Sequence, residues 1–245
     1  MQDFKYLINK ILESPIRNEP FPHIYVEDFF SDDQFQEIIS SPEINIKQSF
    51  TDKEVFKNLF TQGYKIIDFP GCITDQDRYI SWHAEPAKSS AMHSSTEGHG
   101  MTLRLMEPRS SMLTNIKNFI ESDIFSQTIA KKFEISSEDV YSDNGIQKYL
   151  DGYEISPHPD IRKKALTYMV NINPHENADE LLHHTHYLSL KDEFKYVESF
   201  WKGNPNYDRC WVPWDWCDIQ FTQNINNSLV MFAPCDSTIH AVKAD

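Results

Sequence analysis

The spacing of apolar residues changes near the middle of the chain. Before about residue 140, apolar side chains recur at helical intervals, most clearly at Leu113, Ile116, Ile120 and Ile124 and again at Ile129. We expect one or two helices there, packed against a sheet. After about residue 140, short runs of β-branched and aromatic residues alternate with Gly, Pro, Asn and Asp, which indicates a series of strands.

The predicted strands of the second half are all short. They cover residues 147–149, 154–158, 165–172, 187–190, 218–222, 229–233 and 238–242. Many short strands separated by turn residues are typical of a barrel or a sandwich. We therefore predict a mainly β fold with flanking helices (α+β), built on a double-stranded β-helix core of the jelly-roll or cupin-like type. Residues 1–245 would form one domain, helix-rich at about 1–140 and with the β-helix core at about 141–245.

Three further features lie in the first half. Ser31 precedes an apolar helical face, and Gln34 follows it at the spacing of a capping box, so a helix is predicted to begin there. Residues 20–26 are predicted to be extended, because prolines are followed by aromatic and β-branched residues. Residues 80–100 are rich in Ser, His and Gly and predict a long loop.

Charge and composition exclude several classes of partner. The chain has 37 acidic and 23 basic residues and a formal charge of −14, which argues against binding a nucleic-acid backbone. It has neither a signal-peptide pattern nor a run of ~20 apolar residues that would span a membrane. The four cysteines match neither a disulfide framework nor a C-x-x-C pair. We expect reduced thiols and a cytoplasmic location.

The candidate chemistry lies in His158-Pro159-Asp160 and in His240. Side chains two apart on a strand point to the same face, so an extended His-x-Asp segment presents both ligands to one metal ion. His240 lies on a later predicted strand and supplies a third ligand. Two imidazoles and one carboxylate on one face of an ion leave coordination positions open, which suits non-haem Fe(II).

These residues belong to a longer pattern that resembles a known family. The pattern comprises Gln147-x-Tyr149-x-x-Gly152, His158-x-Asp160, residues 165–173, and residues 227–233 ahead of His240. It resembles the iron(II)/2-oxoglutarate-dependent dioxygenases and is most similar to their prolyl-hydroxylase-like branch. The resemblance covers roughly residues 140–245, with a weaker similarity in the Pro-Phe-Pro-His segment near residue 20.

The resemblance implies roles for particular residues. The three iron ligands would be His158, Asp160 and His240. Four residues would border the bound 2-oxoglutarate: Tyr149, Thr167, Met169 and Asn171. The last three alternate along one strand and would point into the barrel, with Asn171 where the family often places a polar contact to the distal carboxylate of the co-substrate.

The resemblance also implies an activity. With Fe(II), 2-oxoglutarate and O2, such an enzyme hydroxylates an unactivated C–H bond and releases succinate and CO2. Related halogenating enzymes have Gly or Ala in place of Asp160, so the carboxylate indicates a hydroxylase. The substrate would be a small molecule or a side chain presented by a peptide or carrier, and no residue pattern indicates an oligomeric state.

One departure from the family pattern concerns the distal carboxylate. The family usually has an Arg or Lys about ten residues beyond the distal histidine, and here the sequence stops at Asp245. We expect that the sequence belongs to a longer chain or that another cation serves. Lys191 and Lys243 are weak substitutes. Arg104 alternates with apolar neighbours and could face inward to bind a carboxylate, but we expect a surface salt bridge instead.

Three alternative functions use the same residues. A cupin-type hydrolase or isomerase would keep the metal ligands without a 2-oxoglutarate pocket, and a non-catalytic barrel would only bind a ligand. His-Pro-Asp is also the signature of J-domain co-chaperones, but there it lies between two helices, whereas its flanks here are predicted strands. Consumption of 2-oxoglutarate with release of succinate separates the dioxygenase from these three.

The remaining histidines and tryptophans have simpler interpretations. His183, His184 and His186 have a spacing that would scatter them on a strand, which favours a polar edge or loop over a metal cluster. The tryptophans at 201, 211, 214 and 216 are predicted to form an aromatic layer over the barrel. The histidines at 83, 93 and 99 fall in the predicted loop and could approach the site, although their spacing does not require it.

Overall fold

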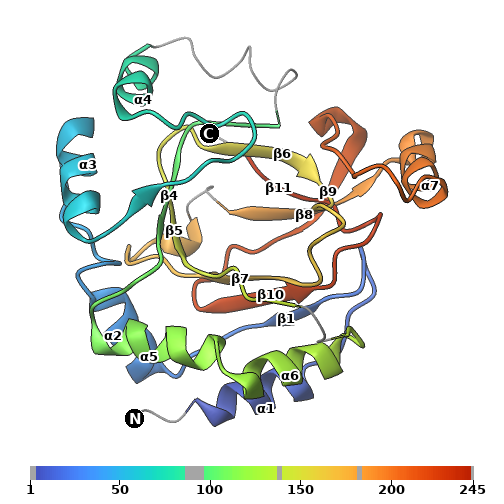
Figure 1. The fold of residues 1–245 in the computed structure, drawn as a ribbon, viewed down its shortest axis with the longest axis horizontal. Helices are drawn as coiled ribbons and strands as arrows, with labels where there is room; N and C mark the ends of the chain where they lie inside the picture. The colour runs from blue at the N-terminus through green and yellow to red at the C-terminus, as the bar shows by residue number, and fades with distance from the viewer. Residues whose placement is uncertain (1–3, 86–96, 137–139, 181–183, 244–245) are drawn as a thin grey trace.

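The computed structural model describes residues 4–85, 97–136, 140–180 and 184–243. The fold that it describes is mixed α+β, with seven α-helices and eleven strands in three antiparallel sheets (Figure 1). The helices are α1 (Lys5–Glu13), α2 (Asp32–Ser40), α3 (Asp52–Thr61), α4 (Gln76–His83), α5 (Ser111–Ile120), α6 (Asp123–Lys132) and α7 (Tyr196–Gly203). The strands are β1 (Ile24–Val26), β2 (Lys65–Ile66), β3 (Gly98–His99), β4 (Thr102–Leu105), β5 (Ile146–Tyr149), β6 (Glu154–His158), β7 (Thr167–Asn171), β8 (Thr185–Leu190), β9 (Cys217–Thr222), β10 (Ser228–Phe232) and β11 (His240–Val242).

The two sheets that position the candidate site face each other. One has the order β3-β6-β11-β8-β9 and the other the order β1-β10-β7. Their facing sides meet in an apolar cluster that joins Tyr187 of β8 to Val230 and Phe232 of β10. The third sheet, β2-β4-β5, stands at one side (Figure 1). Within the described residues, hydrogen bonds do not close these sheets into a barrel.

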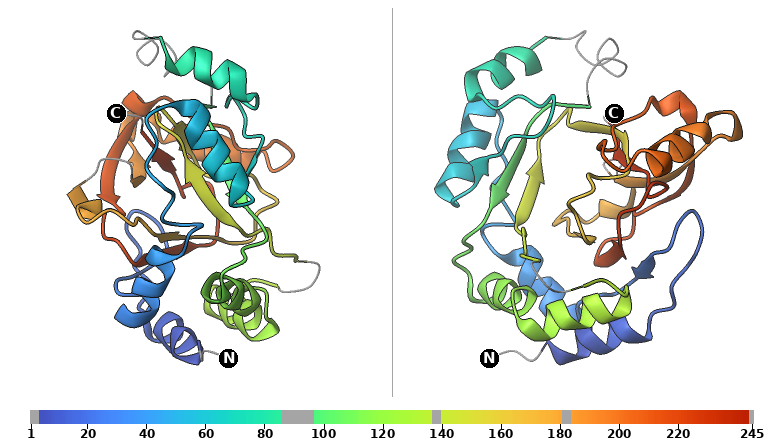
Figure 2. Two further views of the ribbon diagram at one scale, coloured as in Figure 1. Left: turned by 90° about the vertical axis from the view of Figure 1, so that its left-hand side faces the viewer. Right: turned by 45° about the vertical axis from the view of Figure 1, so that its right-hand side comes forward.

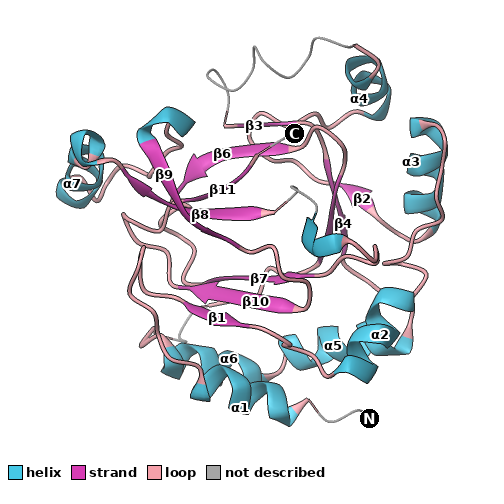
Figure 3. Ribbon diagram, turned by 180° about the vertical axis from the view of Figure 1, so that it is seen from behind, coloured by secondary structure: helices cyan, strands magenta, loops and turns pink. Residues whose placement is uncertain are grey.

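Alternation along β7 and β10 divides their side chains between two environments. Met169 and Val230 lie between the facing sheets. Their neighbours Tyr168, Val170 and Leu229 point the other way, into the largest apolar cluster of the molecule. Helices α1, α2, α5 and α6 supply many of the other residues of that cluster and cover the outer face of the sheet (Figure 3). The β1-β10-β7 sheet is thus buried on one face by helices and on the other by the five-stranded sheet.

The two helices predicted from apolar spacing in the first half are confirmed as α5 and α6. The predicted helix after Ser31 is also present as α2, but the predicted capping box is wrong. The Ser31 side chain makes no capping bond. Instead, Tyr6 of α1 donates its hydroxyl to the Gln34 side chain and accepts the Ser31 backbone N–H at 3.0 Å. A tyrosine that is distant in sequence therefore replaces the local partner.

The predictions of an extended segment and of a long loop in the first half are confirmed only in part. The strand at 20–26 is confined to β1. The loop predicted at 80–100 is wrong at both ends, because α4 continues to His83 and β3 covers Gly98–His99. Residues 86–96 of this predicted loop lie outside the described residues.

The segment between β8 and β9 covers the outer face of the five-stranded sheet. Trp201, Trp214 and Trp216 pack there with Ile239 and Ala241, which confirms the predicted aromatic layer for these three tryptophans. Helix α7 belongs to this segment and lies at the opposite end of the molecule from α3 and α4 (Figure 2). All four cysteines are free, as expected.

Candidate metal centre

Two neighbouring strands bring the predicted histidine ligands together. Strand β6 ends at His158 and β11 begins at His240, and the two residues are direct partners in the antiparallel pairing of these strands. Their ring centroids are 4.4 Å apart. Residues far apart in the sequence therefore meet because the last described strand inserts between β6 and β8.

Asp160 reaches the histidines from a turn and not from a strand, which corrects the predicted geometry. Its φ of 64° lies in the left-handed region, which aspartate tolerates better than most residues. Two contacts hold the turn: Thr238 donates its hydroxyl to the Pro159 carbonyl at 3.1 Å, and Arg209 Nε donates to the Asp160 carbonyl at 3.0 Å. The turn, and not strand alternation, aims the carboxylate at the rings.

Both imidazole rings are fixed by backbone carbonyls. His158 Nδ1 lies 2.8 Å from the Ser156 carbonyl oxygen, and His240 Nδ1 lies 3.0 Å from the Thr238 carbonyl oxygen. Because a carbonyl only accepts, each Nδ1 carries the hydrogen and each Nε2 of the neutral ring presents a lone pair. This is the tautomer that a metal ion bound at Nε2 requires.

The ligand atoms have separations that suit one ion. His158 Nε2 lies 3.6 Å from Asp160 Oδ1, and His240 Nε2 lies 3.7 Å from Asp160 Oδ2. These distances are too long for good hydrogen bonds, whereas metal–ligand bonds of about 2.0–2.2 Å put two ligands of one ion roughly 3–4 Å apart. One ligand atom from each residue lies within 4.8 Å of the others, and all three residues are buried.

Burial and neighbouring charges set the protonation of these ligands. Burial, together with the neighbouring His158, lowers the pKa of His240 to about 4, although Asp160 opposes the shift. For Asp160, burial alone would raise the pKa of the carboxyl, but His240, His158 and Lys164 outweigh burial and lower it well below its usual range. An uncharged His240 ring and an ionised Asp160 are the forms that bind metals. The buried group of His158, Asp160 and His240 can therefore hold a metal ion.

The structure gives the predicted co-substrate residues of β7 other contacts. Thr167 is brought to the metal group, but its hydroxyl donates to Asp160 Oδ2 at 2.6 Å. Met169 faces the space between the sheets, as predicted, and packs in the cluster there. Asn171 uses its amide nitrogen to donate to the carbonyls of Gln223 at 3.3 Å and Ile225 at 3.1 Å. Asn171 thus ties the end of β7 to the turn before β10.

Tyr149 lies at the end of β5, in the third sheet. Its ring stacks on Tyr153 with centroids 4.4 Å apart, and 44% of the residue is exposed. Among the described residues, no hydrogen bond links Tyr149 to the metal group. The structure therefore joins the three predicted metal ligands and Thr167, and it leaves Tyr149 and Asn171 in separate contacts.

Sequence reasoning missed two basic residues at this centre. Lys164 donates its ammonium to Asp160 Oδ1 at 2.5 Å, and Arg209 holds the Asp160 carbonyl. A lysine four residues after an aspartate is a common helix pattern and gave no signal in a turn. Arg209 comes from the segment after α7, and only the folded chain reveals its contact.

The basic residues considered for the distal carboxylate lie elsewhere. Lys191 donates to the Asp215 carbonyl at 2.7 Å, and the Lys243 ammonium lies 5.6 Å from the centroid of the Trp214 ring. Arg104 forms a salt bridge of 2.8 Å with the exposed Asp143, as expected.

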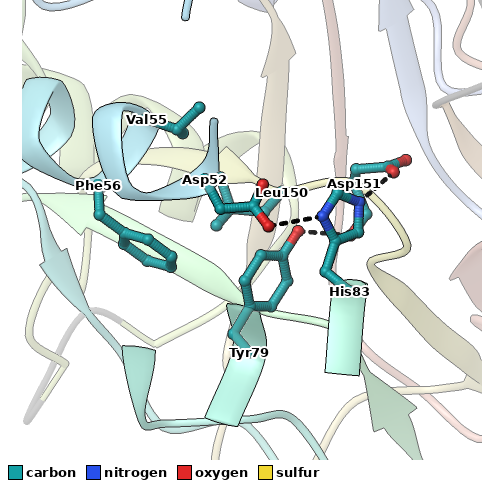
Figure 4. Close-up of a pocket in the computed structure, with 7 residues that line it drawn as sticks. All are labelled: Asp52, Val55, Phe56, Tyr79, His83, Leu150 and Asp151. Atoms are coloured by element: carbon teal, nitrogen blue, oxygen red, sulfur yellow. Dashed lines mark hydrogen bonds and ion pairs between the residues drawn. The ribbon is translucent and has the colours of Figure 1, made fainter. Parts of the chain in front are cut away.

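The other conspicuous histidines lie outside the metal group. His186 contacts the Thr222 hydroxyl at 2.8 Å, and burial lowers its pKa. His184 is buried just before the same strand. His83 lies between Asp52 and Asp151 in a small pocket bordered by α3 and α4 (Figure 4). His99 is in β3, and His93 and His183 fall outside the described residues.

Comparison with known proteins does not assign the chain to a family. No family model matches the sequence, and no curated protein matches it significantly. Within the described part of the chain, no helix has both the length and the apolar character needed to cross a bilayer.

Proposed function

We propose that this protein is an Fe(II)- and 2-oxoglutarate-dependent dioxygenase of the hydroxylase type. One observation carries the proposal: two imidazoles, each with Nδ1 at a backbone carbonyl, and one carboxylate each place a ligand atom within 4.8 Å of the others, so they can occupy one face of a metal ion. Such a facial arrangement leaves positions open for a co-substrate and dioxygen. The substrate would be a small molecule or a side chain presented by a peptide or carrier.

The sheet order supports a double-stranded β-helix as the core of this enzyme. Four antiparallel strands in the order β6-β11-β8-β9 face the antiparallel pair β10-β7. In a jelly roll, two such sheets enclose the site between them. The two histidines lie on adjacent strands of the first sheet, and Thr167 reaches Asp160 from the second.

The roles of the chain's own residues follow from their contacts. His158, Asp160 and His240 would hold iron, which when bound supplies the reaction of dioxygen with 2-oxoglutarate. Phe232 packs against the His240 ring with centroids 5.1 Å apart and limits access of water to it. Thr167 orients the carboxylate, while Tyr149, Met169 and Asn171 are proposed to border the co-substrate.

The test is anaerobic titration of the protein with Fe(II) and then 2-oxoglutarate, followed by admission of air. We expect a visible charge-transfer absorption when 2-oxoglutarate joins the iron, and succinate in amounts equal to the 2-oxoglutarate consumed. The His240→Ala variant, which loses an imidazole ligand, should give neither. Wild-type protein that binds iron but neither binds nor consumes 2-oxoglutarate would reject the dioxygenase.

The positions of the basic side chains support one alternative function. Among the described residues, Lys191, Lys243 and Arg104 all have partners away from the metal group. A metal-binding jelly roll of another class, such as a cupin-type hydrolase or isomerase or a non-catalytic ligand-binding barrel, needs no cation for a distal carboxylate. Metal binding without 2-oxoglutarate binding is the result that would favour it.

A further inference from the structure

The turn between β6 and β7 places a lysine on the predicted metal-binding carboxylate. Lys164 donates to Asp160 Oδ1 at 2.5 Å, while Thr167 donates to Oδ2 at 2.6 Å. Lys164 and Asp160 differ in their exposure to solvent. The Asp160 side chain is 3% exposed and that of Lys164 is 47% exposed, so the ammonium reaches a buried carboxylate from the solvent side.

Lys164 neutralises a charge that would otherwise be costly to bury. An ionised carboxylate removed from water needs a cation or several hydrogen bonds. Arg209, the buried arginine nearby, donates to the backbone carbonyl of Asp160 and pairs with Asp236. Among the described residues, Lys164 is the lysine or arginine whose side chain pairs with this carboxylate.

A metal ion and the Lys164 ammonium compete for the negative charge of the Asp160 carboxylate. An ion bound to Asp160 Oδ1 at about 2.0–2.2 Å would lie within roughly 5 Å of an ammonium on that oxygen, where like charges repel. The ion also supplies the neutralisation that the lysine supplied. Lysine has a long flexible stem and is half exposed here, so it can return to solvent at little cost. Thr167 is uncharged and lies on a strand, so it can keep its bond.

We propose that Lys164 is a displaceable counter-ion, which balances Asp160 in the metal-free protein and leaves when the metal ion binds. This inference rests on the metal site of the proposed function. It assigns Lys164 a positioning role that sets how tightly the metal is held and keeps the empty site folded. It also distinguishes the two partners of Asp160, because Thr167 would support metal binding and Lys164 would oppose it.

The experiment measures two properties of the full chain carrying Lys164→Met. Metal-free protein should melt at a lower temperature than wild type, because a buried carboxylate loses its cation. Co(II), followed by calorimetry and visible absorption, should nevertheless bind about tenfold more tightly, at the low end for a charged hydrogen bond because Lys164 is half exposed. Damage to the fold would instead lower both the melting temperature and the affinity.

Two further variants make the result specific. Lys163→Met removes the neighbouring exposed lysine and should change neither property. Lys164→Arg keeps the positive charge and should bind Co(II) as wild type does. If Lys164→Met binds Co(II) equally or more weakly, while wild type binds it, Lys164 only orients the carboxylate and the counter-ion inference is overturned. If neither wild type nor Lys164→Met binds Co(II) or Fe(II), the proposed function itself fails.

Discussion

Histidine meets aspartate in two regions of this molecule, and the contacts are of opposite kinds. In the candidate metal centre, the nearest distances from His158 and His240 Nε2 to Asp160 oxygens are 3.6 and 3.7 Å. In the pocket beside α3 and α4, His83 Nδ1 lies 2.8 Å from Asp52 Oδ2, and its Nε2 lies 2.6 Å from Asp151 Oδ2 (Figure 4). One arrangement spaces its atoms like ligands of an ion, and the other closes them into hydrogen bonds.

The partner of Nδ1 decides between the two outcomes. A carboxylate only accepts, so His83 must donate from both ring nitrogens to form both bonds, and it then has no lone pair for a metal. His158 and His240 use Nδ1 on backbone carbonyls and keep Nε2 as an acceptor. Both regions are rich in histidine and aspartate, but only the candidate metal centre has the geometry of metal ligands. The His83 pair instead links α3 and α4 to the turn after β5.

The largest expected effect separates the two regions by metal affinity. The His240→Ala variant should bind Mn(II) at least about 100-fold more weakly than wild type, because loss of a ligand should exceed the ~10–100-fold loss seen for outer partners. His83→Ala should bind Mn(II) like wild type. Titration followed by electron paramagnetic resonance measures both. A loss of affinity in His83→Ala as large as that in His240→Ala would break the comparison.

Metal binding should also stabilise the fold, and only through the candidate metal centre. At a free Co(II) concentration about 100 times the dissociation constant, the free energy of unfolding should rise by about 2.7 kcal/mol. Urea denaturation with and without Co(II) should show this increase in wild type and in His83→Ala. At the same Co(II) concentration, His240→Ala should gain at most about 0.4 kcal/mol, because its affinity is at least about 100-fold lower. An increase as large as that of wild type would place the ion elsewhere.

A smaller effect is expected from the hydroxyl that orients Asp160. Thr167→Val removes the 2.6 Å hydrogen bond to Oδ2 and should weaken Co(II) binding about tenfold, as for other outer partners of a metal ligand. Thr167→Ser keeps a hydroxyl and should restore most of the affinity. Calorimetric titration of the three proteins is the measurement, and equal affinities would show that Thr167 does not orient the ligand.

The smallest expected effect belongs to His83. His83→Gln should lower the free energy of unfolding by about 1 kcal/mol, the upper range for partly exposed ion pairs, and should leave Co(II) affinity unchanged. In a protein that already carries Asp52→Asn and Asp151→Asn, the same change should have little further effect. Urea denaturation of the four proteins gives the coupling, and full additivity would show that the His83 contacts contribute nothing.

The candidate metal ligands could be predicted from the sequence because their signal is local and chemical. His158, Asp160 and His240 stand in or beside short apolar runs, and the structure brings them together. Their exact approach could not be predicted. It depends on the left-handed backbone of Asp160 and on Thr238 and Arg209, which arrive from distant segments to hold the turn.

The errors in the fold have the same physical origin. The residues of α2 predicted a capping box, but Tyr6 of a different helix takes both polar groups. Alternation along β7 correctly predicted that Thr167 and Met169 face the opposite sheet. It could not predict that the Asn171 amide would be used by two carbonyls of a later loop. Local sequence patterns predicted helices, strands and the faces of strands. The hydrogen-bond partners of individual side chains were decided by contacts between distant segments.

We expect His158, Asp160 and His240 to bind one iron ion, which then accepts 2-oxoglutarate. The most direct measurement is a crystal structure of the protein soaked without oxygen in Fe(II) and 2-oxoglutarate, with anomalous diffraction at the iron edge. This structure should show one anomalous peak bonded to both Nε2 atoms and to a carboxylate oxygen of Asp160, with 2-oxoglutarate on the open side. An iron peak at another place, or none, would contradict this expectation.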